Sequence, residues 1–335
     1  MKKNSGLTHQ HSVLYAALCA MLSALCVSAE AQQPTKVARI GLIVAVSPSA
    51  AAARIEAFRQ GLRELGYIDA KNIVIEARYA EENLDRLPTL AAELVRLKVD
   101  VIVTAGGQAT RAAKQATSTI PIVMTQDPDP VSSGFVASLA RPAGNITGLS
   151  TLAPELSGKR LELLGEVVPK FSRVAIVGTS TQPGHAQTLK ELKLAAKKLK
   201  VQIQEVDVLK IDDIEVAFRA ASRGRADGVL TLTSAILRSQ RAHLASLAVK
   251  TRIAAIYNDL QFVEAGGLIF YGVSSLDLDR RAASFVDKIL KGAKPGDLPI
   301  EQPAKFDMVV NLKAAKQIGL TIPPNVLARA DKVIR

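Results

Sequence analysis

The chain has 335 residues, 48% of them hydrophobic and 22% charged, with a formal net charge of +12 at pH 7. This length usually divides into two domains, and the composition is that of an ordinary globular protein. The densest basic stretch, 190–200, repeats leucine and alanine at helical spacing, which predicts a solvated amphipathic helix. No basic-aromatic cluster accompanies it, so we expect no nucleic-acid partner.

The first 31 residues have the organisation of a secretory signal peptide. Lys2 and Lys3 precede an apolar run over 13–27, and the Ala-Glu-Ala sequence at 29–31 suits signal peptidase. We therefore expect cleavage after this sequence and a periplasmic location for the rest of the chain. A retained membrane anchor is the alternative, but the run of about 15 residues is shorter than the roughly 20 that span a bilayer.

The cysteines and histidines limit the chemistry of the secreted part. Cys19 and Cys26 both lie in the signal, each preceded by leucine where a lipid-anchoring signal needs a small residue. A core without disulfides must then hold the fold. Beyond the signal only His185 and His243 remain, and a zinc site needs three or four clustered ligands. With no nucleophile elbow or phosphate-binding loop either, we expect no catalytic residue, metal or cofactor.

Along the secreted part, short apolar runs alternate with segments of helical period. This pattern predicts an α/β fold with parallel sheets covered by helices on both faces. We expect strands at 37–44, 73–79, 99–104, 120–124, 145–149, 174–177, 201–208, 228–231, 254–257, 268–271 and 308–311. We expect helices at 51–65, 87–97, 108–117, 131–140, 155–168, 185–199, 214–221, 236–249, 276–290 and 312–318, with a turn-rich loop at 292–299.

The two halves resemble each other in order. The strand at 100–104 with its following loop and helix resembles 227–231, and 120–124 matches 253–257. The segment 130–134 occupies the same place as 262–266. Two similar α/β units predict two Rossmann-like lobes that face each other.

Small and polar residues follow the predicted strands, at the ends where ligands bind to open parallel sheets. Gly106 and Gly107 open a helix, whose free N–H groups favour a carboxylate or another anion. Asp127 and Asp259 stand at equivalent loops, and one of them would suit an ammonium group. The alternative for each is a helix cap or turn. The candidate ligand-binding residues are Ser47, Ser49, Gly106, Gly107, Gln108, Gln126, Asp127, Thr179, Ser234, Tyr257, Asn258, Asp259 and Tyr271.

Short motifs spread over about 36–332 together resemble ABC transporter substrate-binding proteins of the tryptophan/tyrosine-binding type. They are Phe58-Arg59-Gln60-Gly61-Leu62, Leu65-Gly66-Tyr67, Asn72-Ile73, Ile120-Pro121-Ile122-Val123, Asp129-Pro130-Val131, Arg141-Pro142-Ala143-Gly144-Asn145-Ile146-Thr147-Gly148, Lys159-Arg160-Leu161-Glu162-Leu163-Leu164, Phe262-Val263-Glu264-Ala265-Gly266-Gly267-Leu268 and Gly319-Leu320-Thr321-Ile322-Pro323.

The resemblance implies a periplasmic binding protein type I fold, with two lobes joined by a hinge and a ligand cleft between them. It implies one lobe from 36–148 with 276–305 and another from 149–275 with 306–335, with Tyr271 near the hinge. Among rings, only Tyr257 and Tyr271 are expected at the cleft, so stacking on an aromatic amino acid is less assured.

These observations favour a monomeric solute-binding component of an ABC importer. It would bind a small polar solute, such as an amino acid, and deliver it to an inner-membrane permease. An extracytoplasmic sensor or interaction module is the alternative. A cleft enzyme that uses Asp127 and Asp259 as acid and base ranks lower, because no nucleophile or metal cluster accompanies them.

Overall fold

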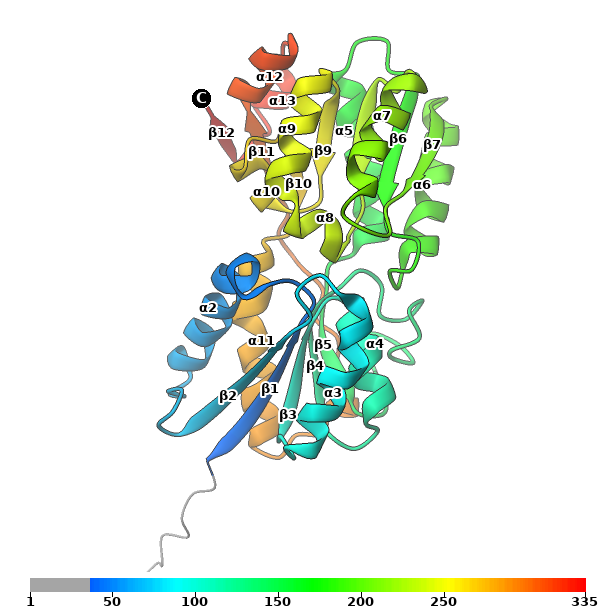
Figure 1. The fold of residues 1–335 in the computed structure, drawn as a ribbon. Helices are drawn as coiled ribbons and strands as arrows, with labels where there is room; N and C mark the ends of the chain where they lie inside the picture. The colour runs from blue at the N-terminus through cyan, green and yellow to red at the C-terminus, as the bar shows by residue number, and fades with distance from the viewer. Residues whose placement is uncertain (1–36) are drawn as a thin grey trace, which may run out of the picture. The chain divides into compact units, whose positions relative to one another are not determined.

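A computed structural model describes residues 37–335, so the signal assignment at 1–31 lies outside the described residues. The fold contains two open sheets (Figure 1). The first has the order β2-β1-β3-β4-β5 and is parallel throughout. Its strands are β1 Ala38–Val44, β2 Ile73–Tyr79, β3 Val101–Ala105, β4 Ile122–Asp127 and β5 Ile146–Ser150.

The second sheet has the order β12-β11-β10-β9-β8-β6-β7, and only the β10–β11 pair is antiparallel. The α/β class with mostly parallel strands is therefore confirmed. The strands are β6 Arg173–Gly178, β7 Gln202–Asp207, β8 Gly228–Thr231, β9 Ala254–Tyr257, β10 Ile269–Gly272, β11 Asp307–Asn311 and β12 Lys332–Ile334.

Helices cover both faces of each sheet, because the strands carry apolar side chains on both sides. Helices α2 and α11 lie side by side on one face of the first sheet, and α3 and α4 cover the other (Figure 1). The helices are α2 Pro48–Glu64, α3 Leu87–Arg96, α4 Gly107–Ala116, α5 Ala153–Val167, α6 His185–Leu199, α7 Asp213–Arg223, α8 Ala235–Ser239, α9 Arg241–Thr251, α10 Leu260–Glu264, α11 Ser275–Leu290, α12 Leu312–Ile318 and α13 Pro324–Leu327, with short 3₁₀ turns at Leu84–Arg86 and Pro295–Asp297.

The internal repeat is confirmed. Strands β7-β6-β8-β9-β10 follow the same order in space as β2-β1-β3-β4-β5. Equivalent aspartates before β3 and β8 also make the same contact. Asp100 accepts a hydrogen bond from the Arg39 N–H, and Asp227 accepts one from the Arg173 N–H, each at 2.8 Å. The Asp100 carboxylate therefore joins the start of β1 to the loop before β3, and the Asp227 carboxylate joins the start of β6 to the loop before β8.

Two predicted helices differ from the structure. No helix forms at 131–140, because the Asp129 carboxylate caps a tight turn and Gly134 then takes a positive φ of 71°. The segment 236–249 is divided at Gln240, which separates α8 from α9. Short elements without a strong period, namely α10, α13 and β12, are not anticipated by the sequence.

The chain passes between the sheets after β5, after β10 and before β11. Helix α11 follows β10 of the second sheet but packs against α2 and β4 of the first. This path agrees with assigning the helix at 276–290 to the first lobe. The exact lobe boundaries, 36–148 with 276–305 and 149–275 with 306–335, stay a prediction.

The contact between α2 and α11 depends on Gly61. A Cβ on this residue would lie 2.1 Å from the Arg280 carbonyl oxygen and 2.9 Å from the Ala283 Cβ. We expect Gly61→Ala to lower the free energy of unfolding by about 1–3 kcal/mol, because the helices must separate. Gly158→Ala in α5 is the control, since its Cβ would meet only the Ala195 Cβ at 3.5 Å. That variant should gain about 0.5–1 kcal/mol in urea denaturation, and equal losses in both would contradict this packing argument.

Candidate ligand site

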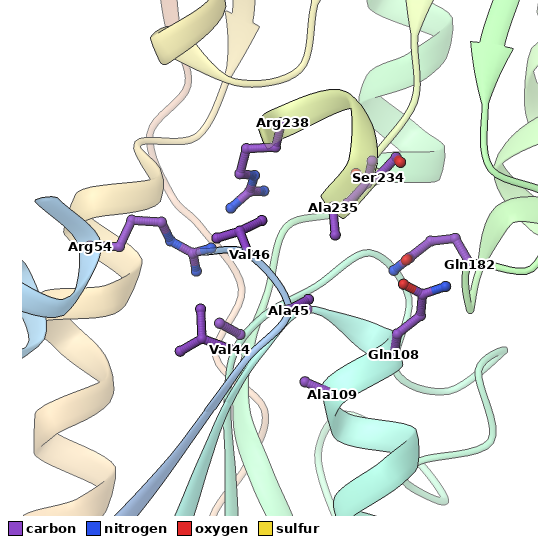
Figure 2. A pocket seen from close by; sticks show the side chains of 13 residues that line it. Val44, Ala45, Val46, Arg54, Gln108, Ala109, Gln182, Ser234, Ala235 and Arg238 are labelled. Atoms are coloured by element: carbon purple, nitrogen blue, oxygen red, sulfur yellow. The ribbon is translucent and has the colours of Figure 1, made fainter. Parts of the chain in front are cut away.

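A pocket lies where the carboxyl ends of β1 and β3 in the first sheet meet α8 of the second (Figure 2). We call it pocket A. Figure 2 shows Arg54 and Arg238 on one side and Gln108 and Gln182 near each other on the other. Its lining is Val44, Ala45, Val46, Arg54, Ala105, Gly106, Gln108, Ala109, Gln182, Thr233, Ser234, Ala235 and Arg238.

A second pocket, pocket B, shares Gly106, Thr233 and Arg238 with pocket A, so the two adjoin. Each has about 410 Å³ of space free of protein atoms, counted with the solvent at its mouth. The lining of pocket B is Gly106, Gln126, Pro128, Thr151, Ala153, Arg160, Thr233, Arg238, Asn258, Val273 and Ser275.

Arg54 is locked in place by a buried carboxylate. Its Nε and Nη2 donate to the two oxygens of Asp279 at 2.6 and 2.9 Å, and Nη2 also reaches the Thr125 hydroxyl at 3.3 Å. Burial opposes the charge of Arg54, and the adjacent Asp279 outweighs it, so the pKa of Arg54 is raised. Arg54 therefore forms a fixed, neutralised wall of pocket A.

Arg238 joins the two sheets at the shared edge of the pockets. Its Nε lies 3.5 Å from the Asp259 carboxylate. Both of its terminal nitrogens donate to the Gln126 side-chain oxygen at 3.4 Å. Burial and the nearby Arg54 lower the pKa of Arg238, which Asp259 partly offsets. These contacts are long, so Arg238 keeps donor capacity for a ligand.

Arg160 enters pocket B from the middle of α5 and is only 3% exposed. Its Nε donates to the Tyr271 carbonyl oxygen at 2.7 Å. Burial lowers the pKa of Arg160 to about 10, so the guanidinium stays charged at neutral pH. Unlike Arg54, it has no carboxylate within ion-pairing distance among residues 37–335.

The N-terminus of α4 completes the site. Gly106 precedes the helix with a φ of 96°, a conformation that side-chain-bearing residues avoid. No side chain caps this end, so the first N–H groups of α4 lack helical partners. Because Gly106 lines both pockets, these donors start at their shared border.

The structure brings several predicted residues together around the pockets. Gly106, Gln108 and Ser234 line pocket A, while Gln126 and Asn258 line pocket B. The Gln126 amide nitrogen donates to Asp279 at 3.1 Å, which orients its oxygen toward Arg238. Their contact with a ligand stays a prediction.

Other predicted residues have structural partners and line neither pocket. Ser47 and Ser49 lie at the start of α2, where their hydroxyls are 3.4 Å apart. The Thr179 hydroxyl is buried between the Val208 carbonyl and Ser234. Gly107 is buried because its Cα packs against Pro183, which leaves no room for a Cβ. We therefore propose no side-chain contact with the solute for Ser47, Ser49 or Thr179, and Gly107 can contribute only its N–H, as the first residue of α4.

The two tyrosines also lie in the apolar core. Tyr257 is fully buried and stacks on Phe262 with ring centroids 4.9 Å apart. Tyr271 packs against the core and against Phe306 at 6.3 Å. Neither ring lines pocket A or pocket B, and no other aromatic residue of the described chain lines them.

Asp127 and Asp259, which the sequence offers as carboxylates for an ammonium group, both form local turn contacts in the structure. Their Oδ1 atoms each accept the N–H two residues on, at 3.0 Å, as the repeat predicts. Asp259 then faces Ser275 and Arg238. Asp127 is fully buried, its Oδ2 has no partner among the described residues, and burial raises its pKa to about 7. Neither lines a pocket.

The residues that sequence reasoning missed are the arginines on helices. Arg160 lies four positions from Leu156 and from Leu164, both buried, so helical spacing places it on the apolar face of α5. Arg54 shares the buried face of α2 with Ala51 and Phe58 in the same way. An arginine on an apolar stripe is the signal that would have found both.

No group of three or more His, Cys, Asp or Glu side chains within 37–335 is placed to hold a metal ion. Over the same residues, no helix is both long and apolar enough to cross a bilayer.

Residues 39–334 match the sequence profile of a family described as ABC transporter substrate binding protein. The chain belongs to this family. A tyrosine-binding protein of Clostridioides difficile (strain R20291) is 26% identical over 263 residues, covering 78% of this chain and 75% of that protein. The resemblance seen in the sequence motifs is thereby confirmed.

Solved structures agree with this family membership. A conserved domain protein from Vibrio cholerae O1 biovar eltor has 29% identity and a TM-score of 0.84, covering 89% of this chain and all of that one. An ABC domain from Streptococcus pneumonia, solved in complex with L-Trp, has 25% identity and a TM-score of 0.83, covering 89% and 99%. Members of this family are substrate-binding proteins, so the general function of the chain is to bind a substrate.

Proposed function

We propose that this chain is the periplasmic solute-binding component of an ABC importer. It binds a small polar solute, an amino acid or a close analogue, in pockets A and B and delivers it to an inner-membrane permease. The observation that carries the proposal is the convergence of Arg54, Arg160, Arg238 and the α4 N-terminus on adjoining pockets. The tyrosine and tryptophan named for two relatives support an amino acid as the solute class.

The chemistry of the pockets supports binding rather than bond breaking. From residues 37–335, their linings offer hydrogen-bond donors and small apolar side chains, but no carboxylate, histidine or cysteine. General acid–base catalysis needs a titratable group within reach of the solute. A donor-rich pocket bounded by elements of two sheets suits capture of a solute by a movement of the lobes. The signal-like N-terminus supports periplasmic delivery, and a monomer is sufficient because both pockets form within one chain.

A thermal-shift screen of the secreted form, purified from the periplasm, tests the proposal. An L-amino acid present at 100 times its dissociation constant should stabilise the folded protein by about 2.7 kcal/mol, a shift of a few degrees. Because no ring lines the pockets, the screen includes aliphatic and polar amino acids beside tyrosine and tryptophan. Mass spectrometry of the denatured protein first establishes that the pockets are empty.

Gly106→Trp should abolish the shift, because the indole would fill the border of the two pockets. Gly66→Trp is its matched control. Both glycines have a positive φ, 96° and 87°, and at both a Cβ would meet nothing within 4 Å. Only Gly106 lies at the pockets, and the melting temperatures of the two solute-free variants show how much strain each substitution adds. An empty, folded protein that no amino acid stabilises would contradict the proposed function.

A further inference from the structure

The buried guanidinium of Arg160 is left unneutralised by the protein. Arg54 and Arg160 are the arginines in the described chain with less than a tenth of their surface exposed. Arg54 has both oxygens of Asp279 at its guanidinium. Arg160 has a single hydrogen bond, from Nε to the Tyr271 carbonyl, and its terminal nitrogens have no protein acceptor among residues 37–335.

A buried charge normally has a partner, because removal from water is costly unless a counter-charge compensates it. Around Arg160 that partner is missing from the pocket wall. Within the described part of the chain, pocket B is lined by Arg160 and Arg238 and by no carboxylate. Arg238 is itself a cation, paired with Asp259 at 3.5 Å, so it cannot neutralise Arg160. The pocket therefore has positive charge that the protein itself does not balance.

We infer that the solute brings the missing anion: its carboxylate pairs with the terminal nitrogens of Arg160 in pocket B. A planar guanidinium with two free amino groups matches a carboxylate in a bidentate arrangement. The uncapped N-terminus of α4, which starts at Gly106 on the same pocket, adds N–H donors of the same preference. The inference rests on the proposed function. It adds that the carboxylate is the group of the solute that is recognised, and that Arg160 recognises it.

The chemistry also says what the pocket discriminates against. A solute whose acid group is blocked as an amide would leave Arg160 buried without a counter-charge, as it is in the empty chain. A cationic amine without a carboxylate would add charge of the same sign beside Arg160 and Arg238. Pocket B should thus reject both, whatever the rest of the solute offers.

Calorimetry on the full secreted protein tests this with a panel of L-amino acids and their C-terminal amides. The amide of the tightest-binding amino acid should bind at least 100-fold more weakly to the unchanged protein. In Arg160→Gln, the amino acid itself should bind far more weakly, and the difference between acid and amide should shrink to the few-fold preference that the α4 N–H donors supply. A double-mutant cycle of this kind isolates the Arg160–carboxylate pair from other effects of each change.

Arg329→Gln is the matched control, because Arg329 pairs with Glu166 on the protein surface and lines neither pocket. It should keep the full preference for the acid. If Arg160→Gln does not fold, the acid-to-amide ratio in the unchanged protein still tests the inference. An amide that binds within threefold of the acid, or an acid preference that stays undiminished in Arg160→Gln, would overturn the inference and leave solute binding intact. A folded, empty protein that binds no amino acid would overturn the proposed function itself.

Discussion

Asp279→Ala should lower the free energy of unfolding by about 3–5 kcal/mol, the cost of leaving one charge of a buried pair without its partner. Both side chains are almost fully buried, with 8% of Arg54 and 4% of Asp279 exposed. Alanine removes both carboxylate acceptors of Arg54 and one of the two acceptors of the Gln126 amide. Arg54 would then be a buried charge without a counter-charge, held only by the Thr125 hydroxyl.

The control is an ion pair of the same type on the surface. Arg63 and Glu56 on α2 lie 2.7 Å apart, with 50% and 60% of their side chains exposed. Because water screens such a pair, Glu56→Ala should cost no more than about 1 kcal/mol. Urea denaturation of both variants measures the contrast. If Asp279→Ala loses no more stability than Glu56→Ala, the pair does not hold α2 and α11 as described.

Asp127→Asn should stabilise the protein at pH 8, although the sequence marks Asp127 as a ligand-binding candidate. Burial raises the pKa of this carboxyl from 3.8 to about 7, and the Asp129 N–H offsets only part of that effect. Asparagine keeps an oxygen for the Asp129 N–H and carries no charge. At pH 8 the gain should reach about 4 kcal/mol at most, the free-energy equivalent of the pKa difference.

The direction with pH follows from where the proton is held. Between pH 4 and 7 the carboxyl is protonated in the folded chain and ionised in the unfolded one, so unfolding releases a proton. The contribution of Asp127 to stability therefore falls as pH rises through this window and stays low above it. Denaturation of Asp127→Asn and the unchanged protein at pH 4, 6 and 8 should show a gap that widens with pH. A gap that is equal at pH 4 and pH 8 would contradict this account.

Much of the fold could be predicted because strong periods dominate it. The strands Ile73–Tyr79, Gly228–Thr231 and Ala254–Tyr257 and the helix His185–Leu199 lie where the sequence places them. A local capping contact can prevent the helix that such a periodic pattern predicts. The apolar residues at 131–140 are helical in spacing, but the carboxylate of Asp129 closes a turn there first.

The site was harder to predict for a different reason. Loops at strand ends can be read from the sequence, and they supplied Gly106, Gln126 and Asn258. Arg54, Arg160 and Arg238 come from helices. A charged side chain in a helix is usually interpreted as part of the solvent-exposed face. The partner of Arg54 is 225 positions away, and no local pattern connects residues at that distance. That Arg160 has no carboxylate partner among the described residues can be established only from the residues that surround it in the fold.

The most direct test of the central claim is a crystal structure of the secreted protein with the amino acid that gives the largest thermal shift. We predict solute density between the first turn of α4, Thr233 and Arg160, with the carboxylate at the terminal nitrogens of Arg160. Density elsewhere would contradict the account, for example in the open surface hollow beside Arg141 and Lys294.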